Sequence, residues 1–129
     1  MSKSLIQTVN QSSQNVEANG IINLGTVLRR FGCNCRLSGN SIIAMGDGYY
    51  KIDANISVTP TEAGAVTVAI YNDGQPITGA IAYGSGSVVT LPIETTIRQR
   101  CCDTGASLTV VLLEGAGVVN NIGIRVEKA

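Results

Sequence analysis

The chain has 129 residues, which is enough for one domain with its own core and too few for two such domains. Hydrophobic residues make up 44% of the chain, a share that excludes intrinsic disorder. Nine basic residues balance nine acidic ones, so the chain has no net charge that would attract nucleic acid or an anionic membrane.

The first nineteen residues are polar and rich in Gln, Ser and Asn. This composition predicts an N-terminal arm over residues 1–19, which is either flexible or ordered by docking on a larger partner. Met1 is not followed by the apolar stretch of a signal peptide, and no apolar run is long enough to span a bilayer. We therefore expect synthesis in a cytoplasm, no signal-peptide export and no membrane partner.

After residue 19 the hydrophobic residues follow a period of two. The longest example places Tyr50, Ile52, Ala54, Ile56 and Val58 on one face of a strand. Similar alternation appears at 65–70, 89–98, 108–112 and 122–127, with shorter apolar segments at 20–28 and 41–45. Gly-containing turns separate these segments, and no segment of useful length has a helical period. The pattern predicts an all-β domain over residues 20–129, an antiparallel two-sheet jelly-roll sandwich of about ten strands.

Two runs and the last strand carry a resemblance to a known family. The runs are Gly48–Ala54 (GYYKIDA) and Gly64–Ile77 (GAVTVAIYNDGQPI), and the last strand is Asn121–Lys128 (NIGIRVEK). In this order they resemble the C1q/TNF-like jelly-roll domain of the kind found in small structural proteins of phages and prophages of Gram-positive bacteria. The resemblance implies a tight homotrimer in which one sheet of each subunit faces the three-fold axis. The chain has no collagen-like stalk, which favours a stand-alone trimer attached through the N-terminal arm.

Four cysteines form two pairs, each flanked by arginines and each at the end of a predicted strand. They are Cys33 and Cys35, and Cys101 and Cys102. If the two strand ends meet, three interpretations remain open: buried free thiols, one or two disulfides between the pairs, or a site in which all four cysteines bind zinc or iron. The spacings C-x-C and C-C differ from the usual C-x2-C of metal sites, so the metal signal is weak.

The sequence predicts a protein without catalytic residues and without a cofactor. It contains no His, which excludes the Ser-His-Asp and Cys-His systems. The glycine-rich run at 84–87 lacks the Lys of a phosphate-binding loop, and Arg29 and Arg30 belong to no basic stripe that would bind nucleic acid. Tyr49, Tyr71 and Tyr83 are candidates either for ligand contact or for cross-strand packing.

Two functions follow from the residues and the resemblance. The first is a non-enzymatic virion structural protein, a trimeric capsid decoration or head or tail fibre component whose arm contacts other virion proteins. The alternative is an adhesive module on a phage, spore or cell surface that binds a host glycan or protein.

Overall fold

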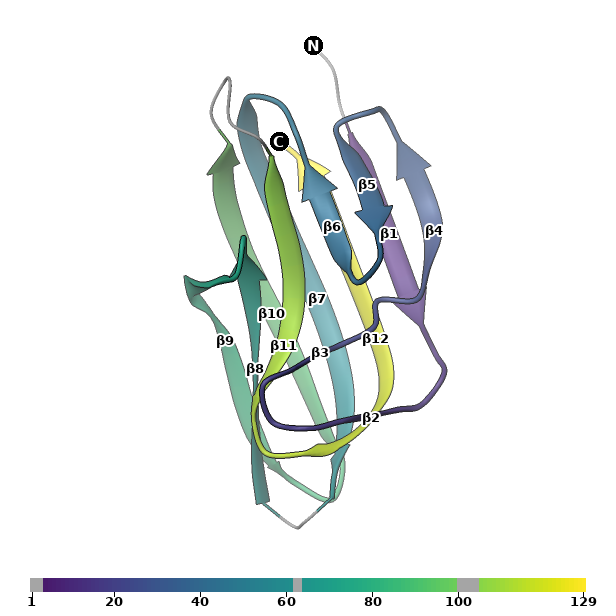
Figure 1. The fold of residues 1–129 in the computed structure, drawn as a ribbon, viewed down its shortest axis with the longest axis vertical. Coiled ribbons are helices and arrows are strands. Elements are labelled where there is room, and N and C mark those ends of the chain that lie inside the picture. The colour runs from purple at the N-terminus through teal and green to yellow at the C-terminus, as the bar shows by residue number, and fades with distance from the viewer. Residues whose placement is uncertain (1–3, 62–63, 100–104) are drawn as a thin grey trace.

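The computed structural model describes residues 4–61, 64–99 and 105–129, which form twelve strands and no helix (Figure 1). In this part of the chain, no helix is therefore long and apolar enough to cross a membrane. The strands are β1 (Leu5–Asn10), β2 (Gln14–Val16), β3 (Gly20–Ile21), β4 (Thr26–Phe31), β5 (Cys35–Ser38), β6 (Ser41–Ala44), β7 (Gly48–Pro60), β8 (Gly64–Asn72), β9 (Gln75–Gly86), β10 (Val89–Gln99), β11 (Ala106–Glu114) and β12 (Gly117–Lys128).

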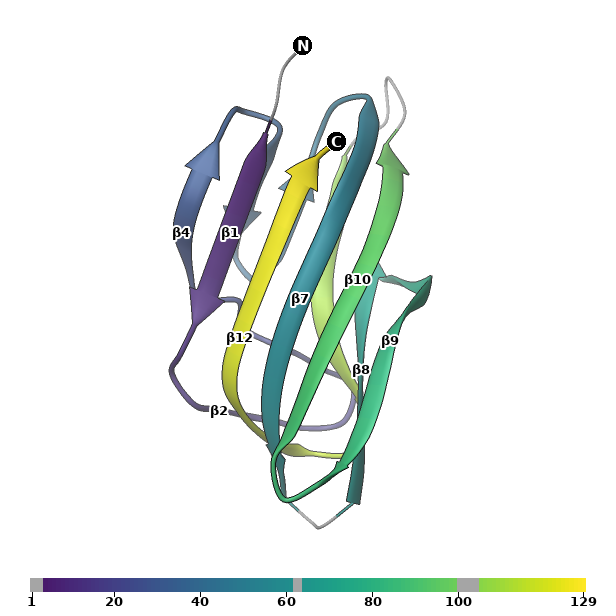
Figure 2. The same ribbon diagram turned by 180° about the vertical axis from the view of Figure 1, so that it is seen from behind.

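The strands form two antiparallel sheets that pack face to face (Figures 1 and 2). One sheet has the order β10-β7-β12-β1-β4, and the other has the order β5-β6-β11-β8-β9. The short strands β2 and β3 pair with β12 and β11, respectively. Ten strands thus build the two main layers, which confirms the predicted jelly-roll sandwich.

The core lies between the sheets, and the predicted alternation fills it. In β7 the side chains of Tyr50, Ile52, Ile56 and Val58 have no exposed surface and Ala54 is only 5% exposed, while the odd-numbered residues from 49 to 57 face outward. The opposite sheet contributes Val, Ile and Leu side chains from β6, β8 and β11 to the same cluster. Because burial of apolar surface is the dominant favourable term in folding, this alternation fixes which face of each strand is inside.

The N-terminal segment differs from the prediction. Residues Leu5–Asn10 form β1, which lies inside a sheet and pairs with β12 on one side and β4 on the other. Ile6 is fully buried, and Val16 is 6% exposed. The expected arm over residues 1–19 is therefore wrong for the described part of that segment, since its backbone is already paired within the domain.

A glycine fixes the path of the chain as it enters β4. Gly25 has a φ of +82°, a conformation that side chains other than glycine rarely adopt. A Cβ atom at this position would overlap the carbonyl oxygen of Val9 in β1. Because Gly25 has no side chain, the segment before β4 can pass close to β1, and β4 then pairs with β1.

Candidate functional site

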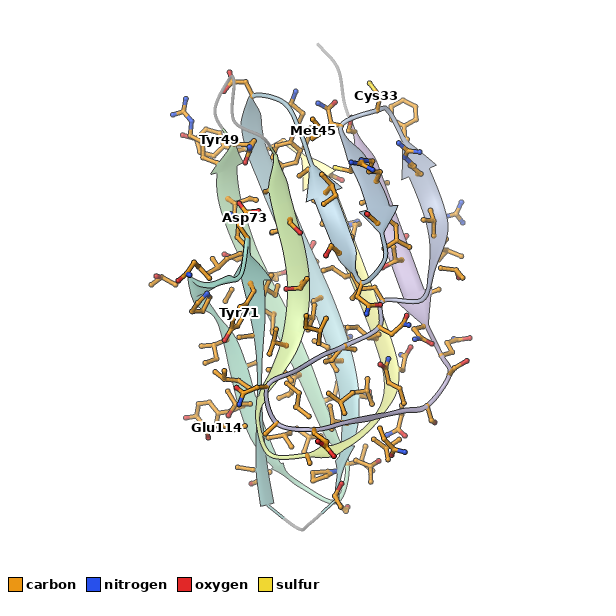
Figure 3. All side chains as sticks on the ribbon, in the orientation of Figure 1. Cys33, Met45, Tyr49, Tyr71, Asp73 and Glu114 are labelled. Carbon is orange, nitrogen blue, oxygen red and sulfur yellow. The ribbon has the colours of Figure 1, made fainter. Side chains whose placement is uncertain are left out.

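The described part of the cysteine region is the turn between β4 and β5. Cys33 is an exposed free thiol (Figure 3). Cys35 is a free thiol that is only 1% exposed. Burial raises the pKa of Cys35 to about 11, although the positive charges of Arg30 and Lys128 oppose the shift. Cys35 is therefore a protonated, buried thiol at neutral pH.

The other cysteine pair, Cys101 and Cys102, lies outside the described residues, so the predicted disulfides and the four-cysteine metal site stay predictions. Over residues 4–61, 64–99 and 105–129, no group of three or more His, Cys, Asp or Glu side chains is placed to share a metal ion.

A hydrogen-bonded cluster ties three segments together beside Cys35. Ser4, 1% exposed, donates from Oγ to Oδ1 of Asn34 at 2.6 Å. Asn34 donates from Nδ2 to the carbonyl oxygen of Met45 at 2.6 Å. The hydroxyl of Tyr50 approaches the carbonyl oxygens of Met45 and Gly46 at 2.7 and 3.0 Å. The cluster joins the start of β1, the β4–β5 turn and the β6–β7 turn, and we assign it a structural role.

The outward face of the β10-β7-β12-β1-β4 sheet carries one row of charged and polar side chains. Strand pairing aligns five residues across the five strands, and we call this set the charged row: Glu94, Asp53, Arg125, Gln7 and Arg29. Its centre holds an ion pair, in which Nη2 of Arg125 lies 3.1 Å from Oδ2 of Asp53. A shallow hollow of about 380 Å³ covers the acidic end and the centre of the row. The row therefore has an acidic end on β10 and a basic end on β4.

The outward face of the other sheet carries a hydrophobic row instead. Pairing between β3, β11, β8 and β9 aligns Ile21, Val111, Ala69 and Ile81, which we call the apolar row. Val111 and Ala69 are 6% and 1% exposed although they lie outside the core cluster, while Ile21 and Ile81 are each about half exposed. Of the four, only Ile21 and Ile81, at the two ends of the row, expose large apolar surface. Exposed apolar side chains of this kind are candidates for contact with a partner.

The three tyrosines considered as ligand contacts are in different places. Tyr49 lies opposite Arg98 on the sheet face that carries the charged row. The guanidinium carbon of Arg98 is 5.4 Å from the centre of the tyrosine ring, in a cation–π contact. Tyr83 is 78% exposed and Tyr71 is partly exposed, and both lie on the sheet with the apolar row. The structure therefore does not bring the three together into one site.

Sequence reasoning missed both rows. Alternation within 49–58 already indicates that Asp53 faces outward, but it does not indicate which residues of other strands lie beside it. The partners Asp53 and Arg125 are 72 residues apart, so only the register of the sheet reveals the row.

No family model and no curated protein matches the sequence, whereas solved structures resemble the fold closely. The crystal structure of murine APRIL at pH 5.0 aligns with a TM-score of 0.76 at 11% identity, covering 99% of this chain and 100% of that chain. The globular domain of zebrafish complement 1qA protein aligns with a TM-score of 0.70 at 6% identity, covering 94% of each chain. The PRD1 vertex protein P5 aligns with a TM-score of 0.68 at 12% identity, covering 97% of this chain and 72% of that chain.

Sequence identities this low show that the fold is shared, and they assign no function to this chain. The chain is a two-sheet jelly roll of the TNF and C1q type, as the sequence resemblance implied.

Proposed function

We propose that this chain is a non-enzymatic structural protein of a bacteriophage particle. It assembles as a homotrimer and serves as a capsid decoration or as a component of a head or tail fibre. It is made in the host cytoplasm, and its place of action is the virion, where its partners are other virion proteins. No nucleic acid, membrane or cofactor takes part.

One observation carries the proposal: 97% of the chain aligns with a vertex protein of a virus, PRD1 P5. The composition supports the same function, because a sequence without His lacks the most frequent general base of enzymes.

Attachment through a free N-terminal arm is not part of the proposal, because β1 is already paired on both sides. Leu5 pairs with Glu127, so β1 begins where β12 ends, at one end of the sandwich (Figure 2). The turn between β11 and β12, which contains Gly115, lies at the opposite end.

Peptide mass spectrometry of purified virions tests the proposal. The virions come from the phage, or the induced prophage, that carries the gene, and are purified on a density gradient. We expect peptides of this chain in the particle band, in a fixed ratio to the major capsid protein. Peptides that appear only in the host surface or spore fraction would contradict the virion assignment and favour the alternative function.

The alternative is an adhesive module that binds a host glycan or protein, and the apolar row favours it as a second candidate. Ile21 and Ile81 expose 52% and 51% of their surface, and Tyr83 exposes 78%. An adhesive module would bind purified host envelope fragments, and the substitution Tyr83→Ala together with Ile81→Ser would weaken that binding. Equal binding by the wild type and this variant would argue against a role for the exposed surface around Ile81 and Tyr83.

A further inference from the structure

The residues at the two ends of the charged row form no ion pair, whereas the two charged residues at its centre pair with each other. Asp53 and Arg125 form the one ion pair found among the described residues. Glu94 and Arg29, at the two ends of the row, are both exposed and form no ion pair there. The row therefore leaves one negative charge at the β10 edge of the sheet and one positive charge at the β4 edge.

These two charges are too far apart to meet within one chain. Neighbouring strands lie about 4.8 Å apart, so four strand spacings separate the two backbones by roughly 19 Å. At the acidic end, Glu94 lies directly opposite Asp53, and like charges opposite each other in a sheet are destabilising. The hollow at this end of the row is lined by three carboxylates, Asp53, Glu94 and Glu127, and by two cations, Lys51 and Arg125, so one negative charge is left unbalanced. The acidic end is therefore suited to receive a further cation from outside the chain.

We propose that this cation is Arg29 of a second copy of the chain, so that the charged row is a contact between subunits. In a ring, the β4 edge of each copy meets the β10 edge of the next, and every copy uses both ends of its row. Contacts between two different patches are the kind that close into a cyclic assembly. The inference rests on the proposed homotrimer and names the residues that join its subunits.

Charge complementarity selects a copy of this chain over another partner. The acidic end has an excess of one negative charge, and the basic end supplies one positive charge beside the uncharged Gln7. The basic end also exposes Phe31, 64% exposed, next to a hollow of about 390 Å³ lined in part by Leu5 and Glu127. An aromatic side chain beside an arginine is a frequent combination at protein interfaces.

Charge reversal and charge exchange test the contact. We expect Glu94→Lys and Arg29→Glu each to weaken the trimer at least tenfold, measured by light scattering over a dilution series, because each places like charges together. The double variant, which exchanges the two charges, is expected to recover the trimer to within about threefold of the wild type. Raising the salt concentration should reduce the effects of the single variants, since salt screens exposed charges.

Two matched controls carry the same charge changes on the other sheet. Glu114→Lys and Arg36→Glu alter exposed residues of β11 and β5, and we expect both to leave the trimer unchanged. Circular dichroism and thermal unfolding of every variant separate loss of assembly from loss of folding.

The outcomes distinguish this inference from the proposed function. A wild-type trimer that tolerates both single reversals, or that the double variant fails to restore, overturns the contact and leaves the homotrimer standing. A wild-type monomer overturns the homotrimer and the contact together. A wild type that is a dimer, which the single reversals weaken and the double variant restores, overturns the ring of three subunits.

Discussion

The substitution Tyr50→Phe removes one hydroxyl group from the hydrogen-bonded cluster and changes little else. The ring of Tyr50 is fully buried, so the phenylalanine ring keeps the same packing. The carbonyl oxygen of Met45 keeps its bond from Asn34 at 2.6 Å, while the carbonyl oxygen of Gly46 loses its 3.0 Å contact. A lost hydrogen bond of this kind lowers the free energy of unfolding by about 1 to 2 kcal/mol.

A second substitution sharpens the prediction, because two donors share one acceptor. Asn34→Ala leaves the Tyr50 hydroxyl on the carbonyl oxygen of Met45, at 2.7 Å. The double variant leaves that oxygen without either donor, so its loss of stability should exceed the sum of the single losses. We expect a coupling free energy of about 0.5 to 1 kcal/mol, which is typical of residues in one hydrogen-bond network.

Urea unfolding followed by circular dichroism, at one fixed protein concentration, measures these losses. With a slope of roughly 2 kcal/mol per molar urea, Tyr50→Phe should lower the midpoint by about 0.5 to 1 M. Tyr49→Phe is the matched control: Tyr49 is 52% exposed, and we expect a change below about 0.5 kcal/mol. Tyr50→Phe with wild-type stability, or strict additivity in the double variant, would refute the assigned role of the cluster.

Three further predictions concern single positions. Thr8 is fully buried, and its hydroxyl has no hydrogen-bond partner among the described residues. Thr8→Val should therefore raise the free energy of unfolding by about 1 kcal/mol in urea titrations, and a loss of stability would contradict this. Gly25→Ala should lower the free energy of unfolding by more than about 2 kcal/mol in urea titrations, because the new methyl group meets the carbonyl oxygen of Val9 at a strained φ. A variant as stable as the wild type would count against the close approach. The folded pKa of Cys35, about 11, lies above the ordinary value of 9.0, so the unfolded chain loses its proton first and the free energy of unfolding should fall by roughly 2 kcal/mol between pH 9 and 11. Cys35→Ala should remove this part of the pH dependence, and an unchanged pH dependence would show that the thiol is not its source.

The sequence predicted the parts of the fold that depend on local alternation. The segment 49–58 was expected as a strand with Tyr50 inside, and β7 covers it with two extra residues at the C-terminal end and one at the N-terminal end. Strand β1 was missed because two polar residues, Ser4 and Thr8, lie on the same buried side as Ile6. That side therefore has one apolar residue between two polar ones, which hides the period of two.

The candidate surfaces depend on pairing between distant strands, which alternation does not encode. The charged row needs Asp53 beside Glu94 on one side and Arg125 on the other. These neighbours follow from the order of five strands in one sheet, and that order is set by the global packing of two apolar faces. Sequence reasoning could identify each residue as outward-facing, but not as a member of a row.

The oligomeric mass in solution is the most direct test, because the homotrimer underlies both the proposed function and the contact through the charged row. Light scattering on a size-exclusion column, at micromolar concentration and moderate salt, gives this mass without a reference standard. We expect three times the chain mass of 13.4 kDa, which is about 40 kDa. A mass near that of a single chain, unchanged as the protein concentration is raised, would contradict the homotrimer.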